Sequence, residues 1–114
     1  MVTIIRGDVV MCDFNPTTGT EQSGIRPAVV LQVDRANAVS PHTIVAPLTT
    51  TIRRVVLPSH VLISAGSGGL TQESVVLCEQ IRVIDKGRII RSLGHLDRAT
   101  MDAIAKAVRA ILGV

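Results

Sequence analysis

Short apolar runs separated by polar turn segments occupy the chain from residue 8 to residue 94. Runs of this length, rich in valine and isoleucine, are typical of β-strands, because helices in globular proteins usually need about ten or more residues. Several runs are apolar at successive positions, which is expected where a sheet curls into a barrel and also packs against a helix or a partner. The pattern predicts five or six strands, within segments 8–14, 27–33, 43–49, 54–63, 74–84 and 88–94.

Prolines and turn residues indicate where these strands are interrupted. Pro47 and Pro58 lie within apolar runs, and because proline cannot donate to a ladder we expect edges or bulges there. The segment SAGSGGL at 64–70 predicts a loop. The segment DKG at 85–87 predicts a hairpin turn.

The last segment, DRATMDAIAKAVRAILGV, has the periodicity of an amphipathic helix. Asp97 is a suitable N-cap and Gly113 a suitable C-cap. We expect the apolar stripe to pack on the sheet or on a second subunit. A membrane-surface helix is not favoured, because the polar face carries few basic residues. The stripe consists of Met101, Ile104, Ala105, Val108, Ile111 and Leu112.

These elements predict a mainly β protein with a C-terminal α-helix, of the α+β class, forming one domain over residues 1–114. A chain of this size buries roughly 60 to 70% of its unfolded surface, enough for one core. No apolar run is long enough to cross a membrane, and the start, MVTIIRGD, lacks the pattern of a signal peptide. We therefore expect no membrane association and a cytoplasmic location.

The two cysteines have no spacing typical of a metal site. Cys12 and Cys78 each lie inside an apolar run, without a CxxC pattern and without a histidine at ligand distance in the sequence. Buried, unpaired cysteines are therefore favoured over a disulfide.

Composition adds two expectations about partners. The hydrophobic fraction of 46% is high for a short chain and favours a homodimer with a buried interface. The net charge is +3, and ten of the twelve basic residues are arginines, whose planar fork suits phosphate and carboxylate groups. A solvated basic surface explains the charge equally well. With one phenylalanine and no tryptophan or tyrosine, the chain has no aromatic platform for stacking bases.

Familiar catalytic signatures are absent from the sequence. It contains no P-loop, dinucleotide fingerprint, HExxH or GxSxG motif, and its three histidines are isolated along the chain. The polar residues that remain as candidates lie in the loop NPTTGTEQSGIRP and at two strand ends, APLTTT and CEQIRVID.

Three segments together resemble the MazF/PemK family of toxin endoribonucleases from bacterial toxin–antitoxin pairs. They are RGDVVMCDFNPTTGTEQSGIRPAVVLQVD, VAPLTT and SVVLCEQIRVIDK, which follow one another in the family's order over nearly the whole chain. The resemblance implies an SH3-like barrel of five to seven strands with a C-terminal helix, and a homodimer. It also implies cleavage of single-stranded RNA at short sequences, without metal or cofactor, restrained by a cognate antitoxin.

Cleavage of RNA without a metal requires three groups. A base removes the proton of the neighbouring 2′-hydroxyl, a cation stabilises the crowded phosphorane, and an acid protonates the leaving 5′-oxygen. Arg26 supplies a permanent charge, and Pro27 biases it toward extended backbone at the start of a strand. In the family, the positions that match Arg26 and Thr49 are the ones most associated with catalysis. Thr49 would donate a hydrogen bond to the phosphate or the developing oxyanion.

Glu21 is the candidate base, because a carboxylate near an arginine stays ionised at neutral pH. The alternative, that Glu21 orders the loop or pairs with Arg26, has nearly equal weight. Some relatives carry a catalytic histidine where this chain has Thr20 and an arginine where it has Leu77. This chain cannot use that arrangement, and a guanidinium with a pKa above roughly 12 is a poor proton donor. The proton donor is therefore unassigned.

Polar residues around these positions are candidates for RNA contact, since amide groups can bind base edges. Glu79 is in addition a second candidate acid or base. Each of them could equally be a structural hydrogen-bonding group. The candidate RNA-binding residues are Thr20, Gln22, Glu79, Gln80 and Arg82.

Two other functions fit part of the sequence. A related group of toxins with a similar barrel inhibits DNA gyrase without enzymatic activity, and fold alone does not separate the two. A basic SH3-like binding module is the third possibility, but it gives Glu21 and Arg26 no chemical task.

Overall fold

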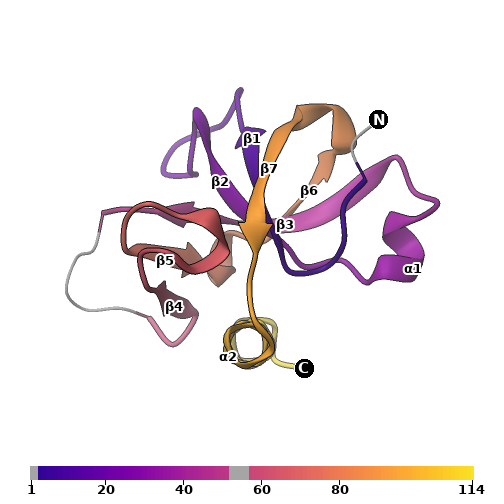
Figure 1. Ribbon diagram of the computed structural model, residues 1–114. Coiled ribbons are helices and arrows are strands. Elements are labelled where there is room, and N and C mark those ends of the chain that lie inside the picture. Colours follow the sequence, from indigo (N-terminus) through magenta and orange to yellow (C-terminus); the bar gives the residue numbers. More distant parts are fainter. Residues whose placement is uncertain (1–2, 52–56) are drawn as a thin grey trace.

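The computed structural model describes residues 3–51 and 57–114, which form a curled antiparallel sheet with a helix packed beneath it (Figure 1). Three short 3-10 turns connect the later strands, at Ser67–Gly69, Cys78–Gln80 and Lys86–Arg88. The strands are β1 (Asp8–Asp13), β2 (Ile25–Val30), β3 (His42–Thr49), β4 (His60–Ile63), β5 (Ser74–Leu77), β6 (Arg82–Asp85) and β7 (Ile89–His95), and the helices are α1 (Asp34–Asn37) and α2 (Arg98–Leu112).

The strands are hydrogen-bonded in the order β4-β5-β3-β2-β1-β7, with β6 also paired to β3, and every pair is antiparallel. Among the described residues no ladder joins β4 to β7, so the sheet curls without closing into a complete ring. The predicted class, mainly β with a C-terminal helix, is confirmed.

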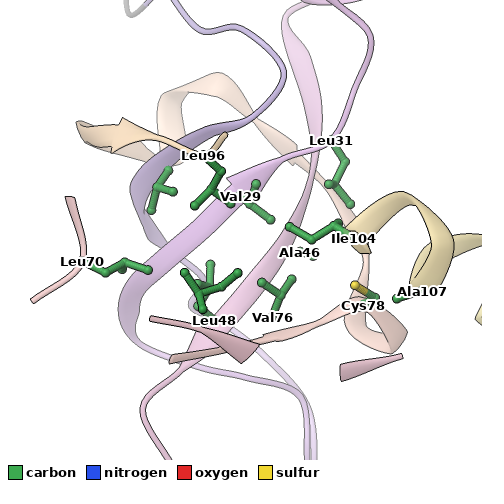
Figure 2. Close-up of a cluster of buried hydrophobic side chains, with 12 residues drawn as sticks. Val29, Leu31, Ala46, Leu48, Leu70, Val76, Cys78, Leu96, Ile104 and Ala107 are labelled. Carbon is green, nitrogen blue, oxygen red and sulfur yellow. The ribbon is translucent and has the colours of Figure 1, made fainter. Parts of the chain in front are cut away.

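Both faces of the central strands are buried, as the unbroken apolar runs predicted. Val9 and Val29 belong to a cluster that α2 covers, whereas their neighbours Val10 and Val30 belong to a second cluster around Phe14. Because successive side chains in a strand point to opposite faces, one short strand contributes to both cores. The side chains on the helix side of the sheet are drawn in Figure 2.

Helix α2 has the caps that the sequence predicted. A side-chain oxygen of Asp97 accepts the N–H of Thr100 at 2.8 Å, and Gly113 ends the helix with φ of 73°. Figure 2 shows Ile104 and Ala107 directed toward the sheet, and both are buried. The sheet is therefore the packing partner of the first half of the stripe, but its last two residues, Ile111 and Leu112, are exposed.

The predicted strand 74–84 is in fact two strands separated by a bulge. Val76 pairs with Leu48 of β3, and Arg82, six residues later, pairs with Val45, only three residues away on the same strand. Three residues are therefore extra on one side of the ladder, and they form the 3-10 turn Cys78–Gln80. This turn is called the bulge below.

Pro47 explains the position of the bulge. The carbonyl of Ile44 accepts the N–H of Leu31 on the β2 side of β3, at 2.8 Å. Since backbone groups alternate in direction along a strand, the nitrogen of Pro47 faces the opposite side, where the bulge interrupts the pairing. The prediction of a bulge at Pro47 is confirmed.

Pro58 lies outside any strand. It occupies a turn in which the N–H of His60 donates to the carbonyl of Leu57 at 2.9 Å, a place that suits proline. The predicted strand 54–63 is shorter than expected, since β4 begins at His60, and residues 54–56 lie outside the described residues.

Two connections differ from the predictions. Asp85 caps a turn at Gly87 by accepting its N–H at 2.7 Å, but β6 pairs with β3 and β7 pairs with β1, so this turn does not make the predicted hairpin. It carries the chain between two edges of the sheet. The short helix α1 was also not predicted, because its four residues are too few for a helical period.

Loop 64–70, predicted as a turn-rich segment, packs tightly on β7. Gly69 has φ of 75°, and a Cβ added to it would lie 2.0 Å from the carbonyl oxygen of Leu93. Gly66 has φ of 93°, but a Cβ there would meet no described atom within 4 Å. Substitution of Gly66 therefore adds backbone strain alone, whereas substitution of Gly69 adds backbone strain and a steric clash.

We expect Gly69→Ala to lower the free energy of unfolding by about 3 kcal/mol or more, because it adds a clash with the backbone to the cost of positive φ. Gly66→Ala, the control, should cost about 1 kcal/mol from positive φ alone. Urea unfolding followed by far-UV circular dichroism measures both, since the chain has no tryptophan or tyrosine. Equal losses in the two variants would contradict the close approach to Leu93.

Candidate active site

A cleft of about 200 Å³ opens beside the bulge. It is formed by the loop between β1 and β2, the middle of β3, and the bulge with the start of β6. The structure thus brings together predicted site residues from two distant segments, Glu21 and Gln22 from one, and Glu79, Gln80 and Arg82 from the other. The lining residues are Phe14, Glu21, Gln22, Pro47, Glu79, Gln80, Ile81 and Arg82.

Two contacts join the walls of this cleft. The backbone N–H of Gln22 donates to Oε1 of Gln80 at 2.8 Å, which ties the β1–β2 loop to the bulge. The guanidinium carbon of Arg82 lies 5.4 Å from the centre of the Phe14 ring, within the range of a cation–π contact. The loop is therefore positioned by the bulge and not by its own sequence alone.

Glu79 is held by the side chains of Ser59, which lies just before β4, and of His60, the first residue of β4. The hydroxyl of Ser59 donates to its Oε1 at 2.9 Å, and Nε2 of His60 lies 2.9 Å from its Oε2. Burial raises the pKa of the Glu79 carboxyl, but the hydrogen bonds from His60, the backbone and Ser59, with the charge of His60, outweigh burial. The pKa is lowered overall, so Glu79 is an anion at neutral pH.

Arg26 and Thr49 do not line this cleft, but they lie next to it on the same face of the sheet. Ala28 pairs with Pro47 at the end of the β2–β3 ladder, and Arg26 and Thr49 each lie two residues beyond that pair on their own strands. Side chains two positions apart in a strand share a face, and Pro47 lines the cleft. Arg26 and Thr49 therefore extend the cleft toward the ends of their strands.

The guanidinium of Arg26 is partly committed. Its Nε donates to the carbonyl of Ser23 at 2.8 Å, which folds the side chain back on the loop. Within residues 3–51 and 57–114 its terminal nitrogens have no hydrogen-bond partner, so they can bind an anion. Oγ1 of Thr49 accepts the N–H of Thr51 at 3.2 Å, and the hydroxyl hydrogen can still be donated to a ligand.

Glu21 contributes to the shape of the loop. Its Oε1 accepts the N–H of Thr18 at 2.9 Å, and its own N–H donates to the carbonyl of Thr18 at 3.3 Å. Glu21 makes no ion pair with Arg26 in the described part of the chain. The geometry thus agrees with the alternative role in ordering the loop, while Oε2 stays open to a substrate. Thr20 is exposed on the same loop and does not line the cleft.

Comparison with known proteins identifies the family of the chain. A family profile described as the PemK-like, MazF-like toxin of type II toxin-antitoxin systems matches residues 5–112. The chain belongs to this toxin family. It is 44% identical over 109 residues to Endoribonuclease EndoA of Bacillus subtilis, covering 96% of this chain and 94% of that protein. It is 41% identical over 109 residues to Endoribonuclease MazF of Staphylococcus saprophyticus, covering 96% and 91%.

Solved structures of the family share the fold. The crystal structure of MazF from Deinococcus radiodurans matches with a TM-score of 0.85 at 27% identity, over 100% of both chains. A mycobacterial endoribonuclease in complex with its cognate antitoxin matches with a TM-score of 0.81 at 26% identity, over 97% of this chain and 96% of that chain. The chain therefore has the fold of these MazF-like toxins.

Ser59 and His60 are the site residues that the sequence did not indicate in this toxin. Their partner Glu79 follows about twenty positions later, so no local spacing marks the contact. The pairing of His60 with Leu77 across β4 and β5 brings them together. The predicted strand 74–84 included Glu79 but ran through the bulge at Cys78–Gln80, so it did not indicate this contact.

Neither cysteine takes part in the site. Cys12 and Cys78 are free and buried, as predicted, and burial raises the pKa of Cys12 to about 12 and that of Cys78 to about 11. In the described ranges no three His, Cys, Asp or Glu side chains gather closely enough to hold a metal ion. None of the helices described is long and apolar enough to cross a membrane.

We expect the stability that Glu79 contributes to depend on pH. Its folded pKa lies below the ordinary glutamate value of 4.5, so this contribution is present above that value and is lost as the pH falls through the folded pKa. The difference in free energy of unfolding between the wild type and Glu79→Gln should be larger at about pH 7 than at about pH 3.5.

Urea unfolding at the two pH values measures this difference. Glu73→Gln is the matched control, because Glu73 is an exposed carboxylate outside the cleft. A difference for Glu79→Gln that grows as the pH is lowered would contradict the stabilising pair with His60.

Proposed function

We propose that this chain is an endoribonuclease toxin that cleaves single-stranded RNA, such as messenger RNA, at short sequences without a metal or other cofactor. The observation that carries the proposal is the near full-length similarity to named endoribonucleases, and a cleft lined by Glu21, Glu79 and Arg82 supports it. The expected place of action is the cytoplasm, where messenger RNA is found. The gyrase-inhibiting alternative is not favoured by these relatives.

The reaction removes one proton, from the 2′-hydroxyl, and delivers one proton, to the leaving 5′-oxygen. A base removes the proton of the 2′-hydroxyl, and the oxygen attacks phosphorus to give a five-coordinate intermediate. The bond to the 5′-oxygen then breaks, leaving a 2′,3′-cyclic phosphate, while a proton passes to the leaving oxygen. Glu21 is the proposed base, through the oxygen that does not contact Thr18.

Arg26 and Thr49 are the proposed groups that stabilise the intermediate. The terminal nitrogens of Arg26 donate no hydrogen bond to any described residue. The planar guanidinium can therefore donate to two phosphate oxygens at once. The hydroxyl of Thr49 would donate to a further oxygen from the end of β3. Rigid strands hold both residues, which limits the reorganisation needed during the reaction.

The cleft beside these residues is proposed to hold the neighbouring nucleotides. Arg82 supplies positive charge for the backbone, and Gln22 and Gln80 supply polar groups at the walls. Thr20 would contact RNA only outside the cleft, from the exposed surface of the loop. Glu79 is not suited to be the proton donor, because its lowered pKa keeps the carboxyl ionised.

The proposed partners are a second copy of the chain and an antitoxin. Leu62 of β4, Ile111 and Leu112 at the end of α2, and Val114 after it are exposed, and α2 contacts β4. Burying this apolar surface favours a homodimer. An acidic or amphipathic antitoxin segment would lie across the groove beside these arginines and block the entry of RNA.

An RNA-cleavage assay with purified protein in excess EDTA tests the proposed activity. We expect cleavage of an unstructured RNA to persist in EDTA. Arg26→Ala should lower the rate by about a hundred-fold or more and Thr49→Ala by about ten-fold or more, because each removes a group that stabilises the intermediate. Arg35→Ala on α1 is the matched control, since Arg35 is exposed and lies outside the cleft.

The outcomes separate the candidate functions. Intact RNA with wild-type protein, together with inhibition of gyrase supercoiling, would overturn the endoribonuclease proposal. Cleavage that survives both Arg26→Ala and Thr49→Ala would keep the activity and refute only the site. Loss of all cleavage in EDTA would show that the reaction depends on a metal.

A further inference from the structure

The bulge places an anion in a cleft that is proposed to bind RNA. Glu79 is the central residue of the three extra residues, and it lines the cleft while 24% of its side chain stays exposed. An ionised carboxylate repels phosphate and can only accept hydrogen bonds. Its ligand within a bound RNA is therefore a donor group and not the backbone phosphate.

The carboxylate is oriented with acceptor capacity to spare. Ser59 donates to Oε1 and His60 to Oε2, each at 2.9 Å, and a backbone N–H adds a third hydrogen bond, so of the four acceptor positions of the carboxylate one stays open. The N–H of Leu57 lies 3.3 Å from Nδ1 of His60 and donates to it, which places the ring proton on Nε2, toward Glu79. Two fixed donors thus hold the carboxylate in one orientation.

Gln80 provides a donor next to this acceptor. Its Oε1 is occupied by the N–H of Gln22, so the orientation of its amide group is set and its Nε2 is directed away from that contact. In the described residues Nε2 has no acceptor. Adjacent residues of the bulge therefore offer an acceptor, from Glu79, and a donor, from Gln80.

This pair of groups matches some nucleobases better than others. Adenine presents an exocyclic amine beside an unprotonated ring nitrogen, and cytosine presents the same order of donor and acceptor. On the Watson–Crick edge of guanine the amine lies beside a protonated N1, where the amide of Gln80 would face a second donor. Uracil has no exocyclic amine. Single-stranded RNA exposes these base edges, so they are available to side chains in a cleft.

We infer that Glu79 determines sequence preference by accepting a hydrogen bond from the exocyclic amine of an adenine or a cytosine, with Gln80 donating to the adjacent ring nitrogen. Ser59 and His60 are positioning residues that hold the Glu79 carboxylate toward the base. The inference rests on the proposed function only in that the ligand is single-stranded RNA. It assigns Glu79 to recognition and not to proton transfer.

Deleting single amines from the RNA tests this recognition directly. In an RNA that the wild type binds, each adenosine is replaced in turn by purine riboside and each cytidine by zebularine, which remove the amine. Binding to versions with 2′-deoxyribose at the cleavage site is measured by fluorescence anisotropy, and cleavage of the all-ribose versions is measured in parallel. We expect one position at which loss of the amine weakens wild-type binding roughly ten-fold.

Glu79→Met provides the second side of the test, because it removes both acceptor oxygens, whereas a glutamine would keep one. It should weaken binding of the unmodified RNA by a similar factor, and amine deletion at the sensitive position should then have little further effect, because the two changes remove the same hydrogen bond. Glu73→Met is the control and should keep the wild-type response. Full sensitivity to amine deletion in Glu79→Met, or no sensitive position in the wild type, would overturn the inference.

Substitutions of His60 test the positioning role. His60→Gln keeps a side-chain donor and should retain part of the response to amine deletion, whereas His60→Leu removes the donor and should lose it. Equal retention of the response in His60→Leu would refute positioning by His60. Circular dichroism spectra check that both variants are folded.

The binding measurement keeps this inference separate from the proposed activity. Wild-type protein that cleaves RNA with no amine-sensitive position would refute the inference and leave the endoribonuclease proposal intact. Wild-type protein that binds RNA with the expected amine dependence but does not cleave it would refute the activity and leave the recognition by Glu79 intact.

Discussion

The burial of both faces of β1, β2 and β3 is the constraint on which the rest of this structure depends. Each central strand supplies alternate side chains to two clusters, because successive side chains in a strand point to opposite faces. One cluster needs α2 as a cover, and the other is enclosed by the curl of the sheet around Phe14. The curl in turn brings the β1–β2 loop over β3 and creates a wall for the cleft.

The interruption of pairing at Pro47 converts this compact sheet into a site. An unbroken ladder would present its edge side chains in regular alternation and leave no cleft, whereas three extra residues opposite Pro47 push polar groups out of the ladder. The hydrogen bond from Gln22 to Gln80 then fastens the loop to this bulge. The feature that weakens the sheet locally is therefore the one that positions the polar residues.

Charges of opposite sign are kept apart by this arrangement, which gives the site two different surfaces. Arg26 lies toward the ends of β2 and β3 with terminal nitrogens that can bind phosphate. Glu79 lies at the bulge, where Ser59 and His60 satisfy part of its acceptor capacity. A cation that positions the backbone and an anion that contacts a base edge are complementary parts of nucleic-acid recognition. Because Arg26 and Glu79 lie apart, they do not pair with each other, and each can contact a ligand.

The sequence by itself determined the elements that depend on local chemistry. Unbroken apolar runs indicated strands buried on two faces, Asp97 and Gly113 marked the ends of α2, and Pro47 marked a bulge, because each signal acts within a few residues. Only the tertiary structure divided segment 74–84, removed the hairpin at 85–87, and joined Glu79 to His60. Those outcomes depend on which strand pairs with which, and pairing between distant segments is set by the shared burial of two cores rather than by local spacing.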